Sequence, residues 1–228
     1  MVSRKTVFWE VDAQADFMLP GGKLYVPGAE KIIPNLRRLV EAARQGRVFV
    51  VSSADAHNPD DAELREWPPH CLKRTPGAEI LPEGLAARRL VIPNDKGLVL
   101  PESLGGYQQV TLEKNTLDVF DNPHADALLG RLGPNGSPSF EANVEFLVFG
   151  VATDYCVRCT VEGLLARGRH VGVVRDAIQP LDAAKGAQLI AEWESRGARL
   201  LSTDQALELC SDSAASSRVS FLKAGTSQ

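Results

Sequence analysis

The sequence predicts an α/β fold, a three-layer α/β/α domain in which helices cover both faces of a mostly parallel central sheet. Two observations carry this prediction. Short apolar runs of strand length alternate with segments of helical periodicity along almost the whole chain. Acidic and basic residues follow the ends of several runs, where open α/β sheets place their chemistry. We expect residues 1–210 to form one domain and the Ser-rich residues 211–228 to form a mobile tail.

Composition argues for a soluble globular protein and against two classes of partner. Of the 228 residues, 44% are hydrophobic and 24% are charged, and the net charge is −4. This charge argues against a nucleic-acid surface, and no apolar run approaches the roughly 18 residues that span a bilayer. Without a signal-peptide pattern or a disulfide framework, the chain is expected to be cytoplasmic. A homo-oligomer is expected, because symmetric oligomers are common among soluble enzymes.

The first half of the predicted sheet ends in acidic residues. Residues 5–12 read as a strand that ends at Asp12. Residues 30–46 have helical spacing, with Gly46 as the C-cap. Residues 47–53 form the next strand, followed by a long irregular loop. Asp12 is therefore expected at the edge of the sheet where α/β enzymes bind substrate.

The irregular loop carries a possible metal site. Asp55 and His57 stand two residues apart, which places both side chains on one side of an extended segment. His70 follows later in the same loop. One carboxylate and two imidazoles with open positions suit Zn, Fe(II) or Mn. Loop histidines are common, so this pattern is weak evidence when taken alone.

The second half of the chain continues the alternation. Residues 88–93 and 107–113 read as strands, and the second of these leads directly into Lys114. Residues 123–132 favour a helix, and residues 133–138 are rich in Gly and Pro, as is typical of a loop. Most lysines are solvated surface residues, so only its position after a strand makes Lys114 a candidate.

A cysteine follows the most apolar strand. Residues 146–149 are of the length and composition of a buried strand, and Thr153 or Asp154 is expected to cap a helix that runs to about residue 167. Cys156 then falls in the first helical turn, where unpaired N–H groups and the helix dipole favour a thiolate. The alternative is a small buried core cysteine, as free cysteines usually are.

The remaining elements complete an α/β pattern. Residues 170–175 predict a strand, residues 182–197 a helix capped by Asp182, and residues 199–202 a short strand. Thr203 is expected to cap a last helix. The common nucleotide-binding patterns, a Gly-rich dinucleotide fingerprint and a phosphate-binding loop, are absent from the sequence.

Four motifs together resemble the isochorismatase-like cysteine hydrolase superfamily, and specifically its nicotinamidase branch. They occur in order, at the ends of predicted strands, between about residues 7 and 201. Residues 12–17 (DAQADF) resemble the first catalytic loop. Asp55-x-His57 with residues 67–71 (WPPHC) resembles the metal loop, Lys114 matches the lysine of the family, and residues 150–157 (GVATDYCV) resemble the nucleophile segment.

The resemblance implies a catalytic triad of Asp12, Lys114 and Cys156. The sulfur would attack an amide carbonyl, and the lysine ammonium would lower the pKa of the thiol. The backbone N–H groups of Ala152 and Cys156 would hold the oxyanion, and the Val151–Ala152 peptide is expected to be cis. Asp12 would take the thiol proton, deliver it to the leaving ammonia, and then activate water to hydrolyse the thioester.

The resemblance also implies one divalent metal ion (Zn, Fe or Mn) on Asp55, His57 and His70. This ion would anchor the ring nitrogen of a pyridine carboxamide, either directly or through water. Phe17 and Trp67 resemble the aromatic walls of the family and would sandwich a flat ring.

Three departures from the family pattern bear on the substrate. The segment between His57 and Trp67 lacks an extra histidine that some nicotinamidases carry. Val119 stands before Phe120, where a serine is usual. Cys159 forms a Cys-x-x-Cys pair with the expected nucleophile.

These observations leave four functions to weigh. The leading hypothesis is a metal-containing amidohydrolase that converts nicotinamide, or a close aromatic amide, into acid and ammonia. The second is another amidase of the superfamily, acting on a carbamoyl, ureido or other small amide. The third is a thiol–disulfide protein that uses the Cys-x-x-Cys pair. The fourth is a catalytically silent relative used as a binding module, which the presence of all three triad residues argues against.

Overall fold

A computed structural model describes residues 4–132 and 144–210. The predicted loop 133–138 and the predicted tail 211–228 lie outside the described residues. Within them, no helix is long and apolar enough to cross a membrane.

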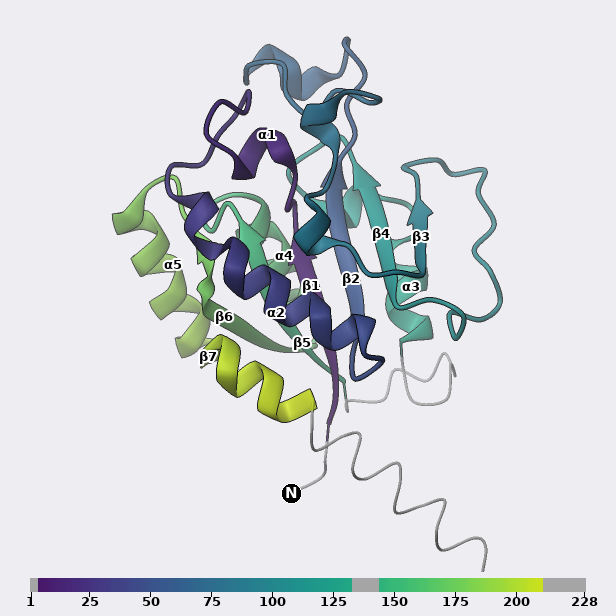
Figure 1. Ribbon diagram of the computed structural model, residues 1–228, viewed down its shortest axis with the longest axis vertical. Helices are drawn as coiled ribbons and strands as arrows, with labels where there is room; N and C mark the ends of the chain where they lie inside the picture. The colour runs from purple at the N-terminus through teal and green to yellow at the C-terminus, as the bar shows by residue number, and fades with distance from the viewer. Residues whose placement is uncertain (1–3, 133–143, 211–228) are drawn as a thin grey trace, which may run out of the picture.

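The centre of the molecule is a seven-stranded sheet whose described strands all pair in parallel (Figure 1). The strand order is β3-β4-β2-β1-β5-β6-β7. The strands are β1 (Lys5–Val11), β2 (Phe49–Asp55), β3 (Arg89–Ile92), β4 (Gln109–Lys114), β5 (Val144–Val151), β6 (His170–Gln179) and β7 (Arg199–Leu201). The predicted α/β/α architecture is confirmed.

Helices cover both faces of this sheet (Figure 1). On the face toward the viewer lies α2 (Ile33–Arg44), and the helical residues 203–210 join it through an ion pair between Arg38 and Asp204. Behind the sheet lie α3 (Ala125–Arg131) and α4 (Cys156–Ala166). The helix α5 (Ala183–Ser195) contacts α4. Every residue of β5 is buried, as expected for a strand of a parallel sheet covered on both faces.

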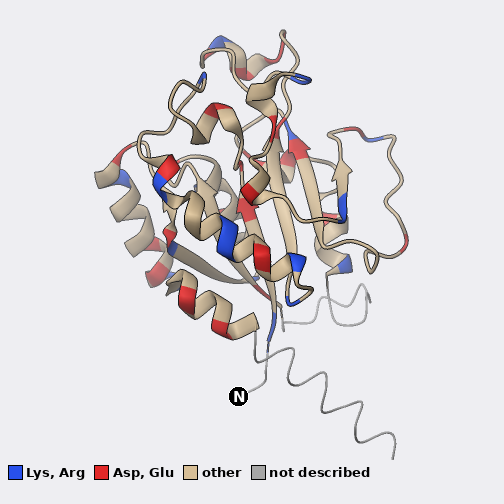
Figure 2. Cartoon of the chain, in the orientation of Figure 1, with Lys and Arg blue, Asp and Glu red and all other residues tan. Residues whose placement is uncertain are grey.

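Positively and negatively charged residues are interspersed along the elements toward the viewer (Figure 2). The helix α2, for example, carries Arg37, Arg38, Glu41 and Arg44 within two turns of each other. At the carboxyl ends of the strands the charged side chains are buried, and there they form the site described below.

Three predicted boundaries at the carboxyl ends of the strands are wrong. The strand β2 lies two residues later than expected, so that Asp55 ends the strand instead of entering the loop. The strand β6 continues to Gln179 through an irregular register beside Gly150. The residue that caps α4 is Tyr155, and Asp154 instead accepts hydrogen bonds from the N–H groups of Leu181 and Asp182.

Two further details of the helices concern their first turns. Residues 15–18, expected as loop, form the short helix α1 (Ala15–Met18). The last helix is capped by Ser202, whose hydroxyl accepts from the N–H of Gln205 while its own N–H donates to the Gln205 side chain. The predicted cap of α5 is confirmed, because Asp182 accepts hydrogen bonds from the N–H groups of Ala184 and Lys185.

Gly150 allows the two central strands to meet at the site. Its φ is 120°, and a Cβ placed there would lie 2.0 Å from the carbonyl oxygen of Val11. Only glycine tolerates both conditions. The peptide that follows, between Val151 and Ala152, is cis, as the resemblance implied.

Candidate active site

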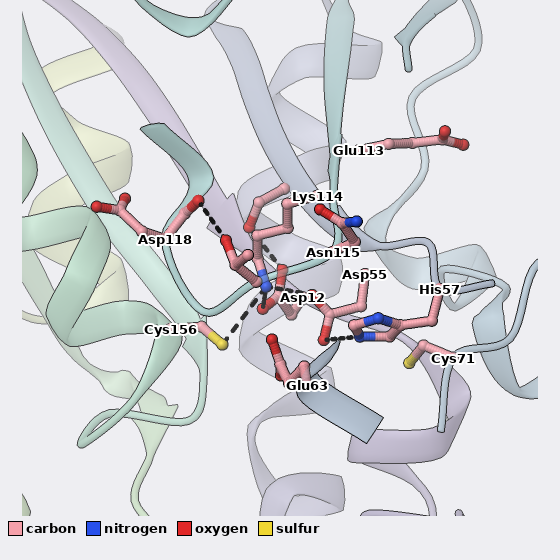
Figure 3. A network of polar contacts seen from close by, with 12 residues as sticks. Asp12, Asp55, His57, Glu63, Cys71, Glu113, Lys114, Asn115, Asp118 and Cys156 are labelled. Carbon is pink, nitrogen blue, oxygen red and sulfur yellow. Dashed lines mark hydrogen bonds and ion pairs between the residues drawn. The ribbon is translucent and has the colours of Figure 1, made fainter. Parts of the chain in front are cut away.

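Three side chains from separate segments meet where the central strands end. Asp12 follows β1, Lys114 ends β4, and Cys156 begins α4 just after β5. Lys114 Nζ lies 3.0 Å from Asp12 Oδ2 and 3.5 Å from Cys156 Sγ. Figure 3 shows the ammonium between the carboxylate and the sulfur. The structure therefore brings together the three residues that the resemblance implied as a triad.

Asp12 is fixed by its neighbours on β2. The Ser53 hydroxyl donates to Asp12 Oδ1 over 2.6 Å, and the Asp12 N–H donates to the Ser53 carbonyl over 3.2 Å. The backbone of Asp12 has a φ of 49°, in the left-handed region that non-glycine residues seldom adopt. Its other oxygen, Oδ2, makes no hydrogen bond in the described structure apart from the ion pair with Lys114. That oxygen is available to a substrate or to a proton.

Burial and neighbouring charges together set the pKa values of Asp12, Lys114 and Cys156. Burial raises the pKa of Cys156, and Asp12 and Asp55 raise it further, against the opposing effect of Lys114. Burial and Asp55 likewise raise the pKa of Asp12. For Lys114 the two carboxylates outweigh burial, so its pKa is raised and it stays charged. Lys114 does lower the pKa of the thiol, as the resemblance implied, but burial and the two acids outweigh it, so the net direction is upward.

Beside the triad lie four potential metal ligands. Ligand atoms of Asp55, His57, Glu63 and His70 all lie within 4.8 Å of one another. Asp55 Oδ2 is 3.4 Å from His70 Nε2 and 3.7 Å from His57 Nε2. Two ligands about 2.0–2.1 Å from a tetrahedral ion are themselves about 3.4 Å apart. The spacing therefore suits a shared ion.

Orphaned polar atoms point to the same place. Asp55 Oδ2 and His57 Nε2 face each other and are buried without a hydrogen-bond partner in the described structure, whereas His57 Nδ1 faces Asp61 Oδ2 at 3.4 Å. Such atoms are rare unless an ion or water satisfies them. His70 Nδ1 lies 2.8 Å from the Pro68 carbonyl, which orients its Nε2 toward Asp55. The donor set fits a divalent metal ion.

Glu63 belongs to this group, although the sequence reasoning did not select it. It lies on a 3₁₀ turn, η2 (Ala62–Arg65), in the loop between the two histidines. Its Oε1 is 4.0 Å from His70 Nε2. The sequence contains one indication of this ligand: Glu63 is an acidic residue in the segment between His57 and Trp67, where some nicotinamidases carry an extra histidine.

Asp55 links the two halves of the site. One of its oxygens pairs with Lys114, and the other faces His57 (Figure 3). The second oxygen also lies 3.4 Å from His70 Nε2. The pKa of Asp55 is lowered, since Lys114 and the two imidazoles outweigh burial. Gln14 holds the Asp55 backbone, accepting from its N–H and donating to its carbonyl, both over 2.7 Å.

A pocket opens beside the sulfur and the ligand group. It is lined by Asp12, Asp55, Glu63, His70, Ala152 and Cys156, together with apolar and aromatic side chains from five segments. The predicted walls Phe17 and Trp67 both line it. Three further walls lie in segments that the sequence singled out: Leu117 follows Lys114 in the segment that bears on the substrate, and Val151 and Tyr155 belong to the nucleophile segment. The sequence reasoning missed Leu24, Val26 and Leu181.

Two residues that line this pocket have backbone N–H groups that are unbonded in the described structure. Ala152 and Cys156 both line it, and neither N–H donates a hydrogen bond among the described residues. For Cys156 this follows from its place as the first residue of α4, where the helix offers no acceptor. Both groups are free to bind a developing negative charge.

Two other residues near the motifs have structural roles. Asp16 accepts from the N–H groups of Lys23 and Cys71, and so ties two loops together, as expected of a loop-capping acid. Cys71 is fully buried and stands outside the four-residue ligand group.

The fold and this site define a cysteine-hydrolase type of centre, and comparison with known proteins identifies the family. The isochorismatase domain family matches residues 7–93 and 87–205. The chain belongs to the isochorismatase family, and the prediction of a hydrolase is confirmed.

Sequence identity to individual relatives is low, between 25% and 27% for three of them. A nicotinamidase of Escherichia coli is 26% identical over 81% of this chain and 94% of its own length. The pyrazinamidase of Pyrococcus horikoshii, solved in complex with zinc, is 27% identical with a TM-score of 0.66, covering 87% of this chain and 99% of its own. The N-carbamoylsarcosine amidase of Thermoplasma acidophilum is 25% identical with a TM-score of 0.66, covering 88% and 97%.

Proposed function

We propose that this protein is a metal-containing cysteine amidohydrolase that converts nicotinamide, or a close aromatic carboxamide, into the acid and ammonia. One observation carries the proposal. The Lys114 ammonium lies between the Asp12 carboxylate and the Cys156 sulfur, at an apolar pocket that four potential metal ligands also border. The similarity to a nicotinamidase and a pyrazinamidase supports this substrate class.

In this mechanism Cys156 and Asp12 exchange one proton. The sulfur attacks the amide carbonyl as Asp12 accepts the thiol proton, which its raised pKa allows it to hold. The N–H groups of Ala152 and Cys156 bind the oxyanion, each contributing on the order of 3 kcal/mol to lowering the barrier. Asp12 then protonates the departing ammonia, and a thioester on Cys156 remains.

Hydrolysis of the thioester uses the same residues. Asp12, again a carboxylate, takes a proton from water as the water oxygen attacks the thioester carbonyl. The acid leaves, and the thiol regains its proton. Lys114 keeps its charge throughout, because two carboxylates hold it, and so stabilises each anionic state of Asp12 and Cys156.

The proposal assigns a divalent metal ion to Asp55, His57, Glu63 and His70. Such an ion would give an aromatic ring nitrogen a point of attachment in the pocket. Support comes from the orphaned buried atoms of Asp55 and His57 and from the spacing of the four ligand atoms. The zinc in the pyrazinamidase of Pyrococcus horikoshii adds to this support.

The pocket walls favour a neutral, flat substrate. Apart from the ligand group and the triad, the described residues that line it are apolar or aromatic, and none is Lys or Arg. A substrate carboxylate held against these apolar walls, away from the proposed metal ion and Lys114, would be buried without a cation, at a cost of several kcal/mol. The second candidate, an amidase for carbamoyl compounds, rests on similarity to the N-carbamoylsarcosine amidase of Thermoplasma acidophilum, and this wall chemistry argues against anionic members of that class.

The experiment is ammonia release from nicotinamide by purified protein, beside Cys156→Ala, with the metal content of each sample measured. Cys210→Ala is the matched control, because Cys210 is also buried but lies outside the site. Release by the wild type and the control but not by Cys156→Ala supports the proposal. Full turnover by Cys156→Ala excludes the thioester mechanism, and turnover of ureido compounds instead of nicotinamide supports the second candidate.

Cytoplasmic location and a homo-oligomer remain predictions. All four cysteines are free, which agrees with a reducing compartment. Size-exclusion chromatography with light scattering would decide the oligomeric state.

A further inference from the structure

Cys159 has no part in the proposed hydrolysis, although it follows Cys156 by one helical turn. We propose that Cys156 and Cys159 form a disulfide on reaction with hydrogen peroxide, and that this disulfide reversibly switches the enzyme off. The inference rests on the proposed function only in that Cys156 is the nucleophile; the disulfide itself can be detected without any substrate.

The helix places the two cysteines within bonding range. In an α-helix, Cα atoms three residues apart are about 5 Å apart, within the range of about 4.4–6.8 Å found in disulfides. Helical side chains lean toward the N-terminus, so the Cys159 sulfur leans back over the first turn, where Cys156 lies.

Cys156, the first residue of α4, is held through its carbonyl, which accepts from the Thr160 hydroxyl over 2.9 Å, but not through its N–H. Helical Cβ atoms three residues apart are about 5–6 Å apart, whereas a disulfide needs about 3.8 Å. Cys156 must therefore shift by about 1–2 Å. Its N–H donates no hydrogen bond in the described structure, and Tyr155 before it has φ −128° and ψ −102°, outside the helical region. The shift breaks no hydrogen bond donated by the Cys156 backbone.

The surroundings of the two sulfurs assign them different roles. Cys156 lines the pocket, so a small oxidant reaches it by the path that substrate uses. Cys159 is half-buried and does not line that pocket, so the oxidant has no comparable path to its sulfur. Peroxide therefore reacts first at Cys156, and Cys159 remains a thiol that resolves the product.

The two steps balance without a further reactant. Asp12 takes the Cys156 proton, the sulfur attacks one peroxide oxygen, and the O–O bond breaks to give the sulfenic acid and a hydroxide, which takes the proton from Asp12 and leaves as water. The Cys159 sulfur then attacks the sulfenic sulfur, the S–O bond breaks, and the second water leaves with the Cys159 proton. Two thiols are oxidised to one disulfide, and one peroxide is reduced to two waters.

Peptide mapping tests the bond directly. Trypsin cleaves after Arg158, between the two cysteines, so a disulfide holds two tryptic peptides together until a reductant separates them. We expect this linked pair in peroxide-treated full-length protein and not in untreated protein. Absence of the linked pair, with Cys156 found as sulfinic acid, would overturn the proposal, and this readout holds even if nicotinamide is not the substrate.

Activity tests the function of the bond. Peroxide should inactivate the wild type, and dithiothreitol should restore at least about half of its activity. Cys159→Ser and Cys159→Ala should start with normal activity and lose it irreversibly, because without a resolving thiol the sulfenic acid is oxidised further. Cys210→Ala should behave as the wild type. Equal recovery by the wild type and both Cys159 variants would overturn the switch.

Discussion

Asp55 and Lys114 stand opposite each other in the parallel register of β2 and β4, and their side chains form an ion pair. Both residues end their strands, so the register of the sheet itself sets their relation. Lys114 also pairs with Asp12, and Asp55 also faces His57 and His70. A single pairing between neighbouring strands therefore connects the proposed triad to the proposed metal group.

Replacing Lys114 by methionine should destabilise the fold as well as abolish activity. The change leaves Asp12 and Asp55 buried without their shared cation. Removing one partner of a buried ion pair costs about 3–5 kcal/mol. Urea unfolding in the presence of a chelator measures this loss, with Lys73→Met as the control because Lys73 is exposed. A loss below about 1 kcal/mol would show that the ammonium does not hold the two acids.

Glu63→Gln should weaken metal binding at least about tenfold, because it removes the charge from one of four grouped ligands. The matched control is Glu66→Gln, since Glu66 is exposed and lies three residues further on, at the end of the same 3₁₀ turn. Zinc affinity can be measured by competition with a chromogenic chelator. Equal affinities for the two variants would place Glu63 outside the metal shell.

Much of the architecture could be predicted, because apolar runs and helical periods report burial directly. β1 and α5 were expected close to their observed bounds, and β5 was expected in the right place but extends two residues further at each end. Local patterns could not place the carboxyl ends of β2 and β6, because pairing with neighbouring strands decides where each strand stops. The predicted caps Thr153 and Asp154 were wrong for a similar reason: the Asp154 carboxylate binds residues near the start of α5 instead.

The candidate site was predictable where its residues belong to motifs. Asp12, Lys114, Cys156, Asp55, His57 and His70 were all selected, and the structure brings them together. Glu63 and the walls Leu24 and Leu181 were not, because loops distant in sequence bring them to the pocket. The raised pKa of Cys156 was also missed, since burial and two carboxylates act through the folded structure alone.

Glu10 should make stability depend on pH. It is fully buried, its Oε2 accepts from Ser52 and Gln109, and burial raises its pKa to about 8. An unfolded glutamate titrates near pH 4.3, so folding takes up a proton between these values. The contribution of Glu10 to the free energy of unfolding is therefore complete below the pKa of glutamate in the unfolded chain. This contribution is lost as the pH rises through about 8, the pKa in the folded protein.

Glu10→Gln removes this titration. The stability of the variant relative to the wild type should increase with pH, by up to about 1.4 kcal/mol per pH unit between pH 5 and 8. Urea unfolding across that range measures the difference. Glu194→Gln, on the exposed face of α5, should follow the wild type. If the free energies of unfolding of Glu10→Gln and the wild type changed with pH in parallel, Glu10 would not be protonated in the folded protein.

Leu117→Ser should raise the KM for nicotinamide about tenfold and change kcat little. Leu117 lines the pocket from the segment after Lys114 but touches none of the groups that exchange protons, so it contributes apolar contact alone. Replacing a leucine wall by a hydroxyl forfeits about 1–3 kcal/mol of binding to a flat ring. Leu19→Ser is the control, because Leu19 is 38% exposed and lies outside the pocket. Steady-state kinetics on nicotinamide and on a short aliphatic amide separate the effects: the KM increase should be largest for the aromatic substrate. A fall in kcat at constant KM would instead show that Leu117 positions the reacting groups.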